Sequence, residues 1–456
     1  MRSDALRRRR VLLGLGVLSG TTALAACGPI ADRAGQPAPA KGPVTIKLSM
    51  WDYRPDIVRD NLDRFEQENP GIKVEGPETG ACCAEYRKRM NTAFLAGERL
   101  DAMYMRDEDA AEWAEARWIL ELDKFPGAKD LDRDEYAFVA EQTHYKGKKY
   151  GTIYYVGPQI AMYNKEHVRQ AGFARPPATM DELRNQALQI KRQRINGVEF
   201  PIWGAPSEGL IEVLYLSSGK RMFDDDLQPS FGKDPLFKDM VERLFQMYTG
   251  DKIFGSDPTV QAPFDNGKSS FSWTSFYDLK RLNGKATGAV AGGQAGGAAA
   301  GQLLNYVNPG FVPGKTGTSA ICRQYAVAAS TRYPLESWKL IYFLGGKDAQ
   351  GKYTVAKRWW IEQGLNFGYK SLADDPDVKK SVEDWGDLDA YNKVMVNASP
   401  RPGIKAPWSD LWRTEFTKVI SDVMAGSLTP KDGVERGVQL WNQMRADFER
   451  NNPPKK

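Results

Sequence analysis

Histidine and cysteine are scarce in this sequence. The chain of 456 residues has two histidines, His144 and His167, and four cysteines. They lack the His/Cys spacing of a zinc site, so we expect no bound metal. A Ser-His-Asp or Cys-His catalytic site would have to use one of the two histidines. A basic turn follows His144 and Glu166 precedes His167, which favours surface positions for both.

Outside residues 1–26, the chain also lacks an excess of positive charge. The chain has 63 Lys and Arg against 58 Asp and Glu, and residues 1–26 contain five Arg and one Asp, which leaves 58 against 57. Nucleic-acid binding needs positive charge clustered on the folded domain. We therefore expect no nucleic-acid partner.

Long apolar runs are absent too. The first run, residues 11–26, has about 16 residues, whereas a membrane-spanning helix needs ~20. It follows the basic cluster Arg7–Arg10 and ends in small residues, which predicts a secretory signal peptide over 1–26. Arg9-Arg10 is also compatible with twin-arginine export, so the export route stays open. No later run is long enough to cross a membrane.

A lone cysteine stands at the end of this signal. Leu24-Ala-Ala-Cys27 resembles the lipobox of bacterial lipoproteins. The resemblance implies that Cys27 becomes the lipidated first residue of the mature chain, on the outer face of the cell membrane. Residues 27–43 are rich in Gly, Pro and Ala, which predicts a flexible tether.

The other three cysteines lie within the predicted folded part. An exported protein can form disulfides, so Cys82 or Cys83 is expected to pair with Cys322. A Cys82–Cys83 bridge and three free thiols are the alternatives.

The mature chain begins with a strand, a helix and a second strand. Val44–Trp51 alternates in polarity, Ile57–Glu68 has its apolar residues on one helical face, and Ile72–Glu75 is a second alternating run. This order predicts an α/β fold that starts with a parallel sheet. About 430 residues are too many for one core, so we expect two or more domains.

Further elements follow from the same signals. Capping boxes at Thr179 and Thr429 each predict the start of a helix. The low-complexity Gly/Ala segment 284–301 has no period of three and predicts a loop. Periodicity predicts helices over 86–96, 108–117 and 334–344, and strands over 100–105 and 160–165.

Three short motifs imitate a catalytic set. Residues 217–220, 306–308 and 315–317 fit the S-x-x-K, Y-x-N and K-T-G boxes of penicillin-recognising enzymes. A glycine and three aspartates soon after Ser217 interrupt the helix that S-x-x-K requires. A serine acyl-transferring enzyme that uses Ser217 and Lys315 is therefore the less favoured alternative. The acidic run 107–109 could serve glycoside hydrolysis, but at a helix start it is more typical of dipole-complementing charge.

One long stretch carries a family resemblance. Residues 145–183, "YKGKKYGTIYYVGPQIAMYNKEHVRQAGFARPPATMDEL", resemble the extracellular solute-binding proteins of bacterial ABC importers, the group that includes maltose-binding protein. Tyr163-Asn-Lys165, Ala171-Gly172, Pro176-Pro177 and Thr179 follow the family's order and spacing. The likeness covers roughly 44–445. It departs from the family pattern at Leu100, where proline is usual, at Cys82-Cys83 and in the 284–301 loop.

The resemblance implies an architecture and a function. It implies two α/β lobes of the type II periplasmic-binding-protein fold, joined by three crossings, with the ligand between them. By matching motifs, lobe 1 would comprise 44–155 and 323–346, and lobe 2 would comprise 157–320 and 350–448. The expected protein is a monomeric lipoprotein that delivers a mono- or oligosaccharide to an ABC permease, without a cofactor and without enzymatic activity. A non-sugar solute, such as a polyamine or a phosphorylated polyol, is the alternative ligand.

Aromatic and polar residues at strand ends are the candidate ligand contacts. In sugar-binding clefts, aromatic rings pack on C–H faces, while charged and amide groups bind hydroxyls. Loops at the carboxyl ends of strands provide both, although core packing is the competing role of each aromatic. The predicted ligand-binding residues are Asp52, Tyr53, Arg54, Glu108, Tyr155, Trp203, Trp273, Tyr277, Trp359, Trp360 and Trp408.

Overall fold

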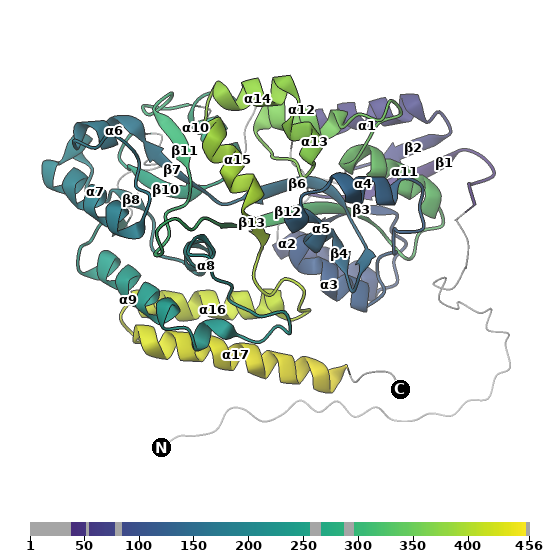
Figure 1. Cartoon of the computed structure of the whole chain (residues 1–456). Helices are drawn as coiled ribbons and strands as arrows, with labels where there is room; N and C mark the ends of the chain where they lie inside the picture. Colours follow the sequence, from purple (N-terminus) through teal and green to yellow (C-terminus); the bar gives the residue numbers. More distant parts are fainter. Residues whose placement is uncertain (1–37, 52–53, 78–83, 256–265, 287–295, 453–456) are drawn as a thin grey trace, which may run out of the picture. The chain divides into compact units, whose positions relative to one another are not determined.

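Two β-sheets organise the chain (Figure 1). The computed structural model describes residues 38–51, 54–77, 84–255, 266–286 and 296–452. The first sheet has the strand order β13-β12-β3-β1-β2, and β6 also pairs with β12. Its strands are β1 (Val44–Ser49), β2 (Ile72–Glu75), β3 (Ala102–Arg106), β6 (Thr152–Pro158), β12 (Thr318–Val327) and β13 (Ala398–Pro400).

The first sheet is mixed in direction. Strand β1 runs parallel to β2 and β3, whereas β12 runs antiparallel to β3 and β6. The predicted strand–helix–strand start is therefore confirmed, because helix α1 (Pro55–Glu68) connects β1 to its parallel neighbour β2. The antiparallel strand β12 comes from far along the chain, and no local pattern predicted its partner.

The second sheet has the order β11-β7-β10-β8-β9. Strand β7 is antiparallel to β10 and β11, while β8 is parallel to β9 and β10. The chain enters this sheet between β6 and β7 and leaves it between β11 and β12. The bounds are β7 (Ile160–Asn164), β8 (Ile202–Trp203), β9 (Phe254–Gly255), β10 (Phe271–Thr274) and β11 (Leu303–Tyr306). The two-lobe α/β fold is thus established, and the exact lobe boundaries stay a prediction.

Helices cover both sheets. In Figure 1, α16 and α17 run together below α9, and these three helices contact one another. Among the helices that the structure describes, none is long and apolar enough to cross a bilayer. Besides α1, the α-helices are α2 (Ala84–Leu95), α3 (Asp107–Glu115), α4 (Ala128–Asp134), α5 (Ala137–Thr143), α6 (Lys165–Gln170), α7 (Met180–Gln193), α8 (Glu208–Ser217), α9 (Pro235–Thr249), α10 (Phe276–Leu282), α11 (Pro334–Gly345), α12 (Thr354–Gln363), α13 (Lys370–Ala373), α14 (Pro376–Glu383), α15 (Leu388–Val396), α16 (Ser409–Met424) and α17 (Pro430–Asn451). A short hairpin is formed by β4 (His144–Tyr145) and β5 (Lys148–Lys149).

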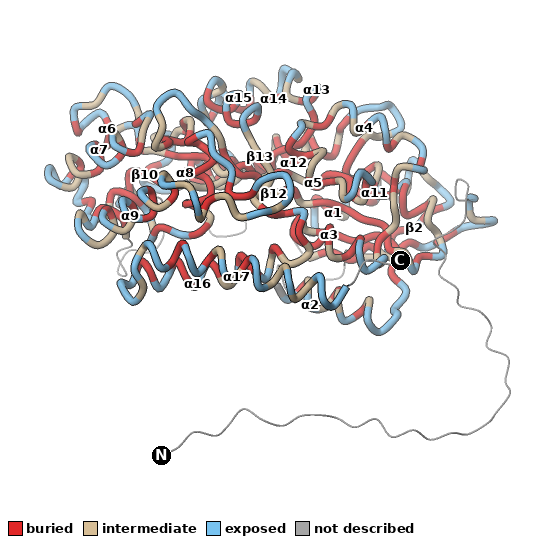
Figure 2. The backbone as a smooth tube through the Cα atoms, turned by 60° about the horizontal axis from the view of Figure 1, so that its bottom comes forward, coloured by how far each residue is buried: buried red, intermediate tan, exposed pale blue. Residues whose placement is uncertain are grey.

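Local signals begin the helices where the sequence predicted. The Thr179 hydroxyl accepts a hydrogen bond from the backbone N–H of Glu182 at 3.2 Å, and Thr429 accepts one from Asp432 at 3.1 Å. Both capping predictions are therefore confirmed. The apolar stripe of α1 is buried, and Figure 2 shows the same division of helices into buried and exposed faces across the chain.

Buried apolar residues form three clusters. The first surrounds β1 and β3, with Leu48 and Met103 as members, and the second lies on the second sheet, with Phe271 and Trp412. The third includes residues of both β6 and β7, such as Ile153 of the first sheet. The core is therefore continued through the region where the chain passes from one sheet to the other.

Cys322 corrects one expectation. It is a free thiol with no solvent exposure, in the third cluster beside Ile153. The disulfide predicted between Cys322 and Cys82 or Cys83 is thus not formed at Cys322, because β12 turns this side chain into the core. Burial raises the pKa of the thiol well above its ordinary value, which makes it unreactive. Cys82 and Cys83 lie outside the described residues, as does Cys27.

Candidate functional site

The first turn of α3 carries three buried carboxylates. Asp107, Glu108 and Asp109 follow directly after β3, and all three are buried. Negative charge at a helix start is favoured by the helix dipole, but buried carboxylates also need cationic partners. Glu108 is the predicted ligand residue in this group.

Two arginines from distant segments hold Glu108. Arg323 on β12 contacts Asp107 and lies 2.5 Å from Glu108 Oε2, while Arg401, after β13, contacts Glu108 Oε1. Burial alone would raise the pKa of Glu108, but the two guanidinium groups hold it well below its ordinary value. Burial and the neighbouring charge of Glu108 instead raise the pKa of Asp107.

A second group of ion pairs joins α2 and β3 to α16. Arg87 lies 2.8 Å from Asp109 and 2.5 Å from Asp410, and Arg106 lies 3.0 Å from Asp109 and 3.7 Å from Asp410. Helix α2 packs in the first apolar cluster and α16 packs in the second. These ion pairs therefore connect elements of two different cores.

A third group is buried between α8 and α16. Arg413 lies 2.7 Å from Glu208 and 2.7 Å from Glu212, and all three side chains are buried. Arg413 forms an ion pair with each carboxylate, and removal of one partner from such a buried group leaves charge uncompensated. Burial raises the pKa of Glu208, while the positive charges of Arg413 and Arg401 lower it. Helix α16 therefore has Asp410 and Arg413 in ion pairs with different elements.

The predicted aromatic residues separate into several environments. Tyr155 and Tyr277 are half-buried and pack against the first cluster, and Tyr155 is opposite Arg323 in the sheet. Trp273 and Trp408 pack, half-buried, against the second cluster. Trp203 is 38% exposed on β8. The structure brings Tyr155 together with Glu108 through Arg323, and it places Trp203 and Trp408 in other surroundings.

Two predicted tryptophans lie deep in the protein. Trp359 is 1% exposed in the first cluster, and Trp360 is fully buried in the third. Trp359 packs edge-on against Tyr154, and Trp360 packs against Phe276. Both residues make the core contacts that compete with a ligand-stacking role.

Arg54 is the described residue of the predicted trio after β1. Its guanidinium makes two hydrogen bonds to Asp56, at 2.9 and 2.7 Å. Asp52 and Tyr53 lie outside the described residues. Arg54 adopts a left-handed backbone conformation, with φ of 49°, immediately before α1.

Sequence reasoning missed five charged residues that surround Glu108 and Asp109: Arg87, Arg106, Arg323, Arg401 and Asp410. One signal was available, because Arg323 is the single charged residue in "TSAICRQYAV", a strand of otherwise neutral residues. A charge in such a strand needs a partner when the strand is buried. Nothing comparable marks Asp410, which reads as an ordinary acidic residue in a first helical turn.

The residues of the enzyme alternative are engaged in structural contacts. The Ser217 side chain is fully buried, and its hydroxyl lies 3.0 Å from the Leu214 carbonyl and 3.2 Å from the Pro309 carbonyl. Lys220, the lysine of S-x-x-K, lies 3.0 Å from Asp234. Lys315 is exposed. Ser217 is therefore held by backbone carbonyls, with no access for a substrate.

His167 is buried, so its predicted surface position is wrong. Asn164 caps α6 and turns His167 toward the second sheet, where its Nδ1 lies 2.9 Å from Ser270 Oγ. The Asn196 side-chain amide lies 2.8 Å from Nε2. Burial lowers the pKa of His167 from 6.5 to about 4. His144 is half-buried.

The neutral His167 predicts a loss of stability in acid. The unfolded chain binds a proton near pH 6.5 and the folded chain only near pH 4, so unfolding becomes more favourable as pH falls through that window. The loss approaches about 3 kcal/mol near pH 4. We expect His167→Gln to remove this part of the pH dependence, measured as the difference between the two urea-unfolding curves at pH 7 and pH 4. If the free energy of unfolding falls by the same amount between pH 7 and pH 4 in both proteins, the assignment to His167 is contradicted.

One described group has the geometry of metal ligands. Atoms of Asp123, Asp132 and His144 lie within 4.8 Å of one another. The buried ammonium of Lys149 stands beside them, 2.7 Å from both Asp132 and Glu135. The ammonium group of Lys149 therefore already pairs with Asp132, and the backbone N–H of Lys149 donates to Asp123.

Comparisons with known proteins agree with this architecture. The sequence profile described as "Bacterial extracellular solute-binding protein" matches residues 51–351. An uncharacterized lipoprotein of Streptomyces antibioticus is 26% identical over 226 residues, 47% of this chain and 46% of that protein. The match thus spans about half the length of that relative.

Solved structures share the fold over most of the chain. The sugar-binding protein MalE of Xanthomonas citri has a TM-score of 0.73 at 18% identity, covering 89% of this chain and 99% of that one. Maltose-bound MalE3 of T. maritima has a TM-score of 0.70 at 18% identity, covering 88% and 99%. The family profile covers more than half of the chain, and the two-lobe fold agrees with it, so this protein belongs to the bacterial extracellular solute-binding proteins.

Proposed function

We propose that this chain captures a carbohydrate between its two lobes and delivers it to the permease of an ABC importer. The observation that carries the proposal is membership of the solute-binding family over residues 51–351. Solved proteins of the same fold are described as sugar-binding or maltose-bound, which supports a carbohydrate here.

The chemistry around Glu108 supports a neutral, polyhydroxylated ligand. Glu108 is an ionised acceptor held by Arg323 and Arg401, and half-buried Tyr155 stands beside Arg323. Carboxylates and guanidinium groups bind hydroxyls well, and aromatic faces pack on sugar C–H groups. Because these charges are paired with one another, they provide no large net charge to attract a charged solute.

A carbohydrate panel tests the proposed function directly. The mature chain without Cys27 is mixed with mono- and oligosaccharides, and its thermal unfolding is measured. A ligand that binds only the folded state stabilises it by ~2.7 kcal/mol at one hundred times Kd. A shift with one sugar class is expected. Shifts only with polyamines or phosphorylated polyols would replace the carbohydrate with those solutes.

Tyr277 is proposed as a stacking residue. It is the second residue of α10, and its half-buried side chain packs against the first cluster. We expect Tyr277→Ala to raise the Kd for the bound sugar at least tenfold, which is ~1.4 kcal/mol, whereas Tyr277→Phe keeps the ring and stays within about threefold of wild type. Isothermal titration measures both. Equal losses in the two variants would assign the effect to the hydroxyl group and not to stacking.

We propose that the protein has no enzymatic activity, because the hydroxyl of Ser217 is buried and bonded to the backbone. Absence of covalent labelling by a β-lactam is the expected result.

We further propose that Cys27 anchors a monomeric protein to the membrane. A relative described as a lipoprotein supports this. Lipid labelling that is lost in Cys27→Ala, with release of the chain from membranes, is the expected result.

A further inference from the structure

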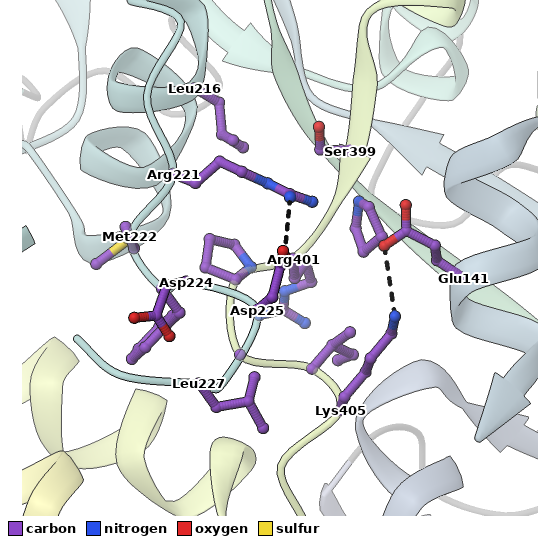
Figure 3. Close-up of a pocket in the computed structure, with 15 residues that line it drawn as sticks. Glu141, Leu216, Arg221, Met222, Asp224, Asp225, Leu227, Ser399, Arg401 and Lys405 are labelled. Atoms are coloured by element: carbon purple, nitrogen blue, oxygen red, sulfur yellow. Dashed lines mark ion pairs between the residues drawn. The ribbon is translucent and has the colours of Figure 1, made fainter. Parts of the chain in front are cut away.

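A polar pocket is lined by residues other than the predicted ligand residues (Figure 3). Its volume is about 260 Å³, and three segments form it: Glu141 of α5, residues 216–227 at and after the end of α8, and residues 399–405 after β13. None of its lining residues is among the eleven predicted ligand contacts.

The pocket lies between elements of the two sheets. Met222 and Phe223 on one wall belong to the second apolar cluster. On the other side, α5, which carries Glu141, packs against β12 and β13 of the first sheet. A solute in this pocket would therefore touch groups that are attached to different cores.

The lining combines an apolar surface with charged groups of both signs. Leu216, Phe223 and Ile404 provide apolar atoms. The charged lining residues are Arg221, Arg401, Lys405, Glu141, Asp224 and Asp225. Three cations stand against three carboxylates, so the lining has no net charge to select a charged solute.

Four of these charged residues form two ion pairs whose N···O distances are too long for direct hydrogen bonds. Arg221 and Asp225 are 3.7 Å apart, and so are Lys405 and Glu141, as drawn in Figure 3. An N–H···O hydrogen bond is normally 2.7–3.2 Å long. These groups therefore keep hydrogen-bonding capacity that the hydroxyl groups of a solute can use.

Arg401 connects the pocket to the charged site on α3. It lines the pocket and also contacts Glu108. One guanidinium group thus contributes both to the pocket and to the fixed charge of Glu108, which places the pocket next to the candidate site and not on a remote surface.

We propose that this pocket binds one neutral, ring-sized polyhydroxylated solute, with its C–H groups on the apolar wall and its hydroxyls on the charged groups. The proposal rests on the proposed function and assigns that function a place. Pockets for drug-sized ligands measure ~300–1,000 Å³, so a pocket of about 260 Å³ accommodates a single ring in preference to an oligosaccharide.

The test compares variants of the lining in titrations with D-glucose, D-galactose, D-mannose, N-acetyl-D-glucosamine and D-mannitol. Glu141→Gln and Arg221→Gln remove one charge each at solvent-accessible positions, and Ser399→Phe fills the pocket. Lys418→Gln removes a surface ion pair with Glu415 on α16 and is the matched control. Circular dichroism at rising temperature establishes that each variant is folded.

We expect wild type and Lys418→Gln to bind at least one probe with equal Kd. Glu141→Gln and Arg221→Gln should raise that Kd at least tenfold, and Ser399→Phe should abolish binding. If Glu141→Gln and Arg221→Gln bind with the affinity of wild type, this pocket is not the binding site, and the proposed function is unaffected. If none of these five probes binds and only oligosaccharides stabilise wild type in the thermal-unfolding panel, the single-ring assignment is overturned. If no carbohydrate in either experiment binds wild type, the proposed function is overturned as well.

Discussion

Replacing Arg413 with methionine is expected to lower the free energy of unfolding by about 3–5 kcal/mol. Arg413 is the cation that Glu208 and Glu212 share, at 2.7 Å from each, and the three side chains are buried between α8 and α16. Methionine fills a similar volume but removes the cation with which both buried carboxylates form ion pairs. Urea unfolding followed by circular dichroism measures the loss.

A surface pair provides the control for this experiment. Arg445 lies 2.9 Å from Glu449 on α17, and its side chain is 30% exposed. Arg445→Met is expected to cost about 0.5 kcal/mol or less, because solvent screens such pairs. Adding Glu208→Gln and Glu212→Gln to Arg413→Met should recover part of the loss, since the uncompensated charges are then removed. Similar losses in Arg413→Met and Arg445→Met would contradict a buried ionic cluster.

Replacing Arg323 with methionine is expected to cost about 3 kcal/mol at neutral pH and more at pH 8 than at pH 5. Arg323 lowers the pKa of both carboxyl groups, against the effect of burial. Its removal therefore raises the pKa of Asp107 further above the ordinary value of 3.8, and it raises the pKa of Glu108, which Arg323 and Arg401 now hold below 4.5. At pH values above the ordinary pKa values of these carboxyl groups, the folded variant then binds more protons than the unfolded chain does. Its stability therefore falls as pH rises through that window.

Unfolding curves at pH 5 and pH 8 measure the effect of Arg323→Met. Arg59→Met is the control, because Arg59 is 40% exposed and pairs with Asp63 and Glu66 on the surface of α1. We expect a small loss in the control, with little dependence on pH. A loss in Arg323→Met that is the same at both pH values would show that packing, and not uncompensated charge, causes it.

Local elements were predictable because their causes are local. The alternation in β1, the apolar face of α1 and the hydroxyl caps at Thr179 and Thr429 each involve residues within one or two turns. The same reasoning failed for His167. A short helix that begins with charged residues suggested solvent, but Asn164 and Ser270 place the ring inside the second sheet.

The candidate site was predictable only in part. Glu108 follows a strand and precedes a helix, which marks it from sequence alone. Its partners Arg323 and Arg401 are more than 200 residues away along the chain. Aromatic residues could not be sorted from the sequence into core and ligand-binding positions. Trp360 lies in the core and Trp203 on the surface, although both are tryptophans.

By itself, the sequence determined that this is an α/β protein, and its motifs placed it with the solute-binding proteins, while the export signal over 1–26 stays a prediction. Those properties depend on composition, on periodicity and on contacts between near neighbours. Only the tertiary structure decided that Arg323 and Arg401 hold Glu108, that Arg87 reaches Asp410, and that Cys322 stays a buried thiol. The reason is that strand order and helix packing set which distant side chains share a buried site, and burial then requires every charge in that site to find a partner.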